Sequence, residues 1–135
     1  SMSNRSPFLS EVEAVLGGPG SVRRCSPAQL LTQWEQFVEW CEEGYRWDVS
    51  EYLNEISVRE NLERLLSAES LQSYPEMQAL MANVNEIDAR FRALLKPDVQ
   101  LENRDHWWER GVLKRAGEPY ATYFREAYGI PVETV

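Results

Sequence analysis

Three glutamates form the first pattern in this chain that could do chemistry. In a helix, Glu35, Glu39 and Glu42 follow the spacing i, i+4, i+7 and would lie on one face. Residues 35–63 carry nine carboxylates against two arginines, in a chain whose formal net charge is −8. Clustered charge attracts a partner of opposite sign and accelerates its association. The stripe therefore predicts a docking face for a basic partner, and a merely solvated helix face is the alternative.

Tryptophans accompany both charged regions. Trp40 lies off the centre of the expected apolar face, so it either packs beneath neighbouring aromatic rings or contacts a partner. Trp107 and Arg110 would share a polar helix face within residues 104–115, where cations outnumber carboxylates. Trp and Arg are enriched in interface hot spots. The alternative is that Trp107 packs on a neighbouring helix with Arg110 stacked on it. The candidate partner-binding residues are Glu35, Glu39, Glu42, Trp40, Trp107 and Arg110.

Catalytic chemistry has little support in this sequence. His106 is the one histidine, so any Ser–His or Cys–His pair must use it. Glu102 and His106 would share a helix face, but no Glu-x-x-His motif accompanies them, and a metal site needs several converging ligands. Neither a P-loop nor a G-x-G-x-x-G motif is present. The sequence thus indicates no catalytic residue, no metal site and no cofactor, and it favours a non-enzymatic role.

The composition is typical of a small globular protein. A length of 135 residues predicts a single domain over 1–135, with Ser1 interpreted as the remnant of an expression tag. An acidic chain argues against nucleic-acid binding. No apolar stretch approaches about 20 residues, so we expect no membrane span, and the N-terminus lacks a secretory-signal pattern. Cys25 and Cys41 are interpreted as reduced thiols, which indicates a cytoplasmic protein.

Capping residues predict helices along the first half of the chain. Residues 6–7 and 26–27 are both Ser-Pro, an N-cap followed by an N1 proline. The Gly-Gly-Pro-Gly segment at 17–20 should end the first helix in a flexible joint, and Gly44 should end the second. Two shorter helices should follow, capped by Asp48 or Ser50 and by a capping box of Ser57 and Glu60.

The second half of the chain contains the clearest helix. Residues 75–96 carry apolar side chains in steps of three and four, which is a heptad seam of nearly three repeats. The seam predicts the central helix of a bundle, and a homodimer through the same residues is the alternative. The residues that would form this contact are Leu80, Val84, Ile87 and Phe91.

Two further helices are predicted at 105–116 and 119–128, the second ending at Gly129 and burying Tyr120, Tyr123, Phe124, Ala127 and Tyr128. No segment alternates with period two, so we expect no sheet. The predicted fold is all-α, an irregular bundle of six or seven helices.

The leading functional hypothesis is a small acidic, non-enzymatic module that binds a basic protein partner. Immunity-type inhibitors, antitoxins and adaptors share this composition, which is an analogy of composition and not of motif. The alternative is an enzyme or a small-ligand-binding protein with an aromatic-lined pocket among its helices.

Overall fold

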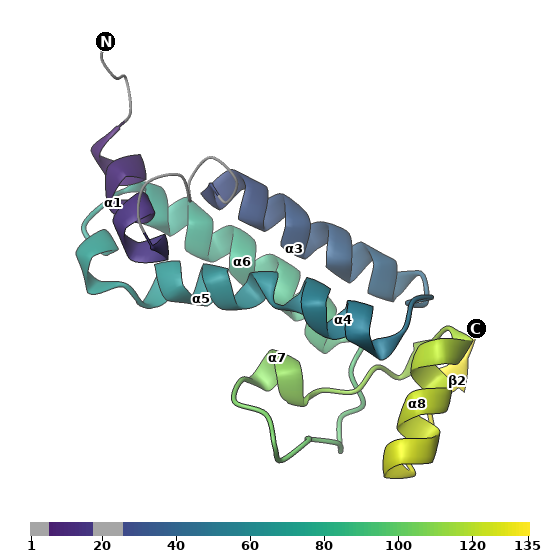
Figure 1. Ribbon diagram of the computed structural model, residues 1–135. Coiled ribbons are helices and arrows are strands. Elements are labelled where there is room, and N and C mark those ends of the chain that lie inside the picture. The colour runs from purple at the N-terminus through teal and green to yellow at the C-terminus, as the bar shows by residue number, and fades with distance from the viewer. Residues whose placement is uncertain (1–5, 18–25) are drawn as a thin grey trace.

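The computed structural model describes residues 6–17 and 26–135, and this part of the chain is mostly helical, which confirms the all-α prediction (Figure 1). None of the described helices is both long and apolar enough to cross a bilayer. Six described helices have eight or more residues: α1 (Pro7–Leu16), α3 (Pro27–Glu42), α4 (Val49–Ile56), α5 (Val58–Ser67), α6 (Glu76–Arg92) and α8 (Glu118–Tyr128). A 3-10 turn, η1 (Glu69–Leu71), and a four-residue helix, α7 (Trp107–Arg110), complete the helical elements.

Most of the predicted caps are confirmed. The side chains of Ser6, Ser26 and Asp48 accept hydrogen bonds from backbone amides three residues ahead, at 2.9–3.2 Å. Gly44 follows α3 with a φ of 94°, a conformation that favours glycine. The remainder of the predicted glycine joint, residues 18–20, lies outside the described residues, as do Ser1 and Cys25.

One predicted cap is wrong. The chain does break between α4 and α5 near Ser57, but Ser57 makes no capping bond to α5. Its hydroxyl instead donates to the backbone carbonyl of Asn54 at 2.6 Å. Ser57 has helical φ and ψ, whereas an N-cap residue is normally extended. Its hydroxyl therefore bonds to the preceding turn in place of the first turn of α5.

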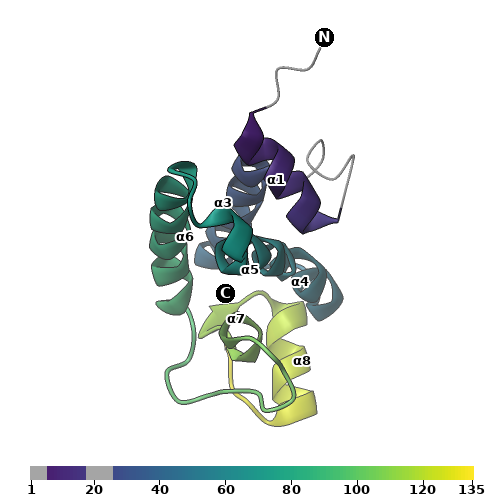
Figure 2. The same cartoon turned by 90° about the vertical axis from the view of Figure 1, so that its left-hand side faces the viewer.

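The core lies where α3 packs between α5 and α6, and α1 covers α5 at one end (Figures 1 and 2). The seam of α6 faces this core. Leu80, Val84, Ile87 and Phe91 are each at most 5% exposed within one chain. The residues of the suggested homodimer contact are therefore buried within one chain. This agrees with the first interpretation of the heptad seam, the central helix of a bundle.

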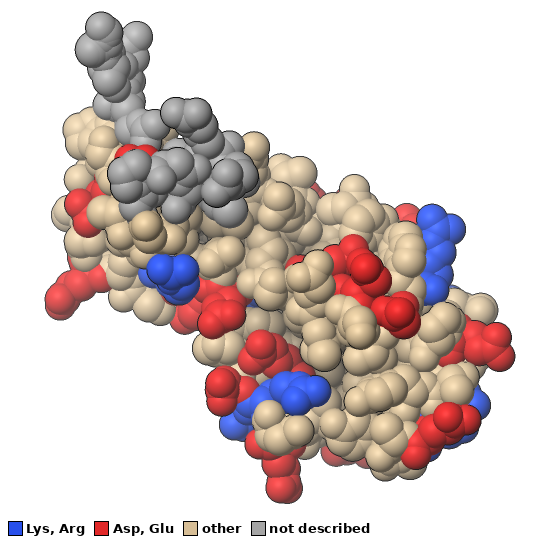
Figure 3. Space-filling view, in the orientation of Figure 1, with Lys and Arg blue, Asp and Glu red and all other residues tan. Residues whose placement is uncertain are grey.

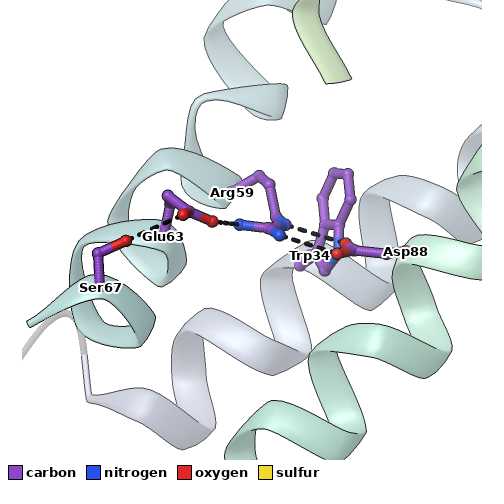
Figure 4. A network of polar contacts seen from close by, with 5 residues as sticks. All are labelled: Trp34, Arg59, Glu63, Ser67 and Asp88. Carbon is purple, nitrogen blue, oxygen red and sulfur yellow. Dashed lines mark hydrogen bonds and ion pairs between the residues drawn. The ribbon is translucent and has the colours of Figure 1, made fainter. Parts of the chain in front are cut away.

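A buried polar network joins three of these helices (Figure 4). The indole Nε1 of Trp34 and the Nε of Arg59 both donate to one carboxylate oxygen of Asp88, at 3.0 and 2.9 Å. Arg59 also donates to the second oxygen of Asp88 at 2.8 Å. Arg59 and Asp88 are each only 4% exposed. The network continues along α5 through Glu63 to Ser67.

The prediction of a helix over 105–116 is largely wrong. Only α7 is helical there, and Trp108 is buried beneath Arg59, whose guanidinium lies 4.5 Å from the indole centre. The following residues are extended because backbone bonds hold them. The amide of Leu101 donates to the carbonyl of Arg110, and Leu113 forms an antiparallel bridge with Leu95.

The prediction of no sheet is also wrong. Strand β1 (Arg115–Ala116) pairs in parallel with β2 (Glu133–Thr134). The segment before α8 therefore contacts the segment after it. Strands of two residues are too short to show alternation, which is why the sequence pattern could not reveal them.

Helix α8 extends away from the bundle beside this small sheet (Figure 2). Gly129 ends it in the left-handed conformation, as predicted. The expected apolar face is only partly buried. Tyr120 and Phe124 are buried, whereas Ala127 is exposed and Tyr123 and Tyr128 are 41% and 39% exposed. The C-terminal half of α8 therefore lies beyond the surface that the core can cover.

Candidate functional site: a groove between α3 and the α4–α5 junction

The acidic stripe predicted on α3 is paired within the protein at two of its three positions. Arg90 of α6 donates to Glu35 at 2.9 Å and to both oxygens of Glu42 at 3.1 and 2.9 Å. The hydrogen bond from Arg90 lowers the pKa of the Glu42 carboxyl below its usual value. Glu39 lies between them on the helix and is exposed. The stripe therefore contributes less free charge than its sequence indicated.

We expect Arg90→Gln to raise the pKa of Glu42 toward the ordinary glutamate value of about 4.3. Because the folded-state pKa is the lower one, the stabilisation by this pair is present above the unfolded pKa and is lost as the pH falls through the folded pKa. Both side chains are about a third exposed, so the loss should stay below about 1 kcal/mol. Carboxyl-carbon NMR titration measures the pKa. An unchanged Glu42 titration in the variant would contradict the pairing.

A groove of about 450 Å³ lies on a different side of α3, where this helix faces the α4–α5 junction. Its wall combines four amide side chains and two hydroxyls with the aromatic rings of Phe37 and Trp40. The lining residues are Thr32, Gln33, Gln36, Phe37, Trp40, Asn54, Glu55, Ser57, Val58 and Asn61. Polar groups able to both donate and accept thus surround an aromatic contact surface.

Trp40 packs against a neighbouring aromatic ring, which is one of the two interpretations of its off-centre position, and contact with a partner stays a prediction. Trp40 is half-buried and lines the groove. Its ring also packs edge-on against Trp47 at 4.9 Å between ring centres. Trp47 in turn contacts Tyr45 at 5.4 Å, and the guanidinium of Arg46 lies over Trp47 at 4.9 Å. The packing holds Trp40 in place and leaves part of it available to a ligand.

Glu55 is the only titratable group among the described residues that line the groove. Its carboxylate accepts a hydrogen bond from the hydroxyl of buried Tyr45. Burial, and secondly this hydrogen bond with Glu55, raise the pKa of Tyr45 well above its usual value. Tyr45 therefore stays protonated at neutral pH and acts as a hydrogen-bond donor. This arrangement orients Glu55, and it supplies no second acid or base of matched pKa.

Two further carboxylates share helix faces with residues that line the groove. Glu43 follows Trp40 by three residues and Gln36 by seven, so it shares their helix face. Glu51 precedes Glu55 by four residues on α4. Both are exposed, and Figure 3 shows carboxylates gathered where the C-terminal half of α3 meets α4. The sequence-based list of partner-binding residues did not include Glu43 and Glu51. The signal that could have found them was their helical spacing from Trp40 and from Glu55.

Trp107 and Arg110 lie apart from the groove. Trp107 is half-buried, and the guanidinium of Arg92, from the last turn of α6, lies 3.9 Å from its ring centre. Arg110 instead donates to the backbone carbonyl of Arg104 at 2.9 Å. Arg92 of α6, and not Arg110, therefore stacks on Trp107. The spacing of residues 104–115 could not predict this contact, because Arg92 lies outside that segment.

The chain matches no protein-family model, no curated protein and no solved structure. Within the described ranges, no three side chains of His, Cys, Asp or Glu converge as metal ligands would. Glu102 and His106 do not share a helix face, because α7 begins only at Trp107. The functional argument consequently rests on the groove and its own residues.

Proposed function

We propose that this protein is a non-enzymatic interaction module that binds an extended basic segment of a partner protein in the groove. One observation supports this most directly: among the described residues, the amide-lined hollow is lined by Trp40 and Glu55 and by no cation. Glu43 and Glu51 are exposed at helical spacing from these two residues. The charge and the hydrogen-bonding groups of the hollow are therefore complementary to a basic peptide.

Amide side chains suit an extended backbone because each one donates and accepts, as a peptide group does. Gln33 and Gln36 on α3 face Asn54 and Asn61 across the groove. A peptide lying between them could exchange hydrogen bonds with both walls. An aromatic ring in such a position is typical of the few residues that carry most of the binding energy. Trp40 would therefore contribute affinity, and the amides would determine orientation.

The carboxylates would act mainly on the rate of association. Exposed charges steer encounter and are screened over about 8 Å at physiological salt. The charges proposed to steer the partner are those of Glu43, Glu51 and Glu55. They replace Glu35 and Glu42 of the predicted stripe, because these two already bind Arg90. Glu39 is exposed between Glu35 and Glu42, and it stays a proposed contributor to the negative charge that attracts the partner. A cytoplasmic location is part of the proposal, supported by the free buried thiol of Cys41.

A small-ligand-binding function is the second candidate. The groove volume lies within the range of about 300–1,000 Å³ that small-molecule sites occupy. Such a ligand would need hydroxyl or amide groups to match the lining, with a ring or apolar part against Trp40. Binding that does not depend on the charge of the ligand would favour this candidate over the basic peptide.

The test uses immobilised peptides of equal length that differ in charge, with binding followed by surface plasmon resonance at two salt concentrations. We expect basic peptides to bind better than neutral or acidic ones, with association slowing as salt rises. Glu43→Gln/Glu51→Gln should mainly slow association. Trp40→Ala should mainly speed dissociation, by about tenfold or more, because a contact of hot-spot type is lost.

The matched control is Glu76→Gln/Glu126→Gln, which removes the same charge from exposed positions on α6 and α8. Its association rate should remain close to that of the unmodified protein, apart from the shared effect of net charge. If the control pair slows association as much as the groove pair, the groove is not the docking site. Equal binding of acidic and basic peptides would contradict the proposed partner chemistry.

A further inference from the structure

A second hollow, of about 360 Å³, lies at the end of α6. Its charged lining is positive, in contrast to that of the α3 groove. The last turn of α6, the loop after it and residues 111–114 surround it. Its cations are Arg92, Lys96 and Lys114, and none of the described residues lining it is a carboxylate. These two lysines are the only lysines in the whole sequence. A chain of net charge −8 thus places both of its lysines in one hollow.

Backbone hydrogen bonds join the two segments that carry these lysines. The amide of Lys96 donates to the carbonyl of Val112 at 2.8 Å, and the amide of Lys114 donates to the carbonyl of Leu94 at 2.8 Å. Gly111 lies at this crossing, where an added Cβ would meet the end of the Leu95 side chain. A side chain at position 111 would therefore require Leu95 to move.

The cations keep hydrogen-bonding capacity that the protein does not use. Arg92 lies over Trp107, a contact that orients its guanidinium without occupying its N–H donors. Lys114 donates one bond, to the carbonyl of Ala93 at 3.1 Å. Neither Arg92 nor Lys96 forms an ion pair within residues 6–17 and 26–135. Asp98, in the same loop, does not line the hollow.

We propose that this hollow binds the phosphate monoester group of a small organic ligand. A phosphate monoester carries nearly two negative charges at neutral pH and three strong acceptor oxygens, which suits two ammonium groups and one guanidinium. The volume of the hollow is larger than a phosphate group alone would fill. Leu95, Pro97, Val99 and Trp107 provide an apolar wall for the rest of the ligand. This site shares no lining residue with the α3 groove, so the two proposals stand or fall separately.

The lysine content allows a direct test. Reductive methylation with carbon-13 formaldehyde keeps the positive charge and labels Lys96, Lys114 and the terminal amine, which serves as an internal control. Phenyl phosphate is then titrated and followed by NMR, with Lys96→Arg and Lys114→Arg used to assign the signals. We expect both lysine signals to shift along one saturable curve, with a dissociation constant of about 1 mM or below, while the terminal amine signal stays in place.

Comparison ligands and variants define the chemistry. Inorganic phosphate, which lacks the ring, and phenylacetate, which lacks the second charge, should each bind about tenfold more weakly than phenyl phosphate. Arg92→Gln should weaken phenyl phosphate binding by about tenfold, whereas Arg125→Gln, the same loss of charge at an exposed position of α8, should not.

Lysine signals that do not saturate would overturn the proposal, as would equal binding of phenylacetate or equal effects of the two arginine variants. A phosphoserine peptide that binds about tenfold tighter than phenyl phosphate would overturn the assignment to a small ligand, and would instead place a phosphorylated protein there.

Discussion

Replacing Asp88 with alanine is expected to lower the free energy of unfolding by about 3–5 kcal/mol. The change leaves the guanidinium of Arg59 buried without its carboxylate, and it removes the acceptor of the Trp34 indole. Burial by itself lowers the pKa of Arg59, but the hydrogen bonds that it donates to Asp88, the negative charge of Asp88 and the contact with Glu63 together outweigh burial and keep the pKa raised. Losing Asp88 therefore exposes the full cost of burying that charge. Urea denaturation followed by circular dichroism measures the difference.

The control is Glu63→Ala, which removes the other carboxylate that Arg59 contacts. Glu63 is 39% exposed, so its loss should cost only about 1 kcal/mol or less. Combining Arg59→Met with Asp88→Asn should cost less than the sum of the two single changes, because the double variant leaves no unpaired buried charge. Equal costs for Asp88→Ala and Glu63→Ala would show that the buried pair is not the stabilising contact.

Phe91→Ala is expected to cost about 3–5 kcal/mol as well, for a different reason. Phe91 is fully buried, and its ring centre lies 5.2 Å from that of Trp34 and 5.9 Å from that of Phe37. Removing the ring creates a cavity between α3 and α6 at the position where they pack. Thermal and urea denaturation give the loss, and sedimentation gives the mass of each variant.

The matched control on the same helix is Met81→Ala, because Met81 is 41% exposed and should cost about 0.5 kcal/mol or less. Sedimentation separates this packing from the homodimer alternative. If the unmodified protein is a dimer and Phe91→Ala yields an equally stable monomer, the seam is an intermolecular contact and the packing described above is wrong.

Local signals in the sequence were sufficient for most helix starts and for the core face of α6. A serine or aspartate side chain satisfies a backbone amide only three residues away, so Ser6, Ser26 and Asp48 could be interpreted without knowledge of the fold. The same holds for Gly129, whose left-handed conformation ends α8. Spacing of three and four along α6 likewise placed Val84 and Phe91 inside.

Interactions between distant residues could not be predicted in this way. Arg90 is 48 residues from Glu42 and 55 from Glu35, and only the packing of α3 on α6 brings it to both. The sequence therefore located an acidic stripe correctly on one helix, but not the charge that remained free. Asp88 and Arg59 were missed because a count of apolar spacing excludes charged residues from the core, although a paired charge can be buried there.

The region after α6 was determined almost wholly by tertiary structure. Residues 105–116 have helical spacing, yet only Trp107–Arg110 are helical. Residues 112–116 instead pair with residues 94–96 and with the C-terminal strand, and this pairing satisfies backbone amides and carbonyls there. That pairing also brings Lys96 and Lys114 to the wall of one hollow. Sequence alone thus determined most of the helical segments and where most of them begin. Which charges meet, and which hollows remain between the elements, depended on contacts across tens of residues that only the folded chain provides.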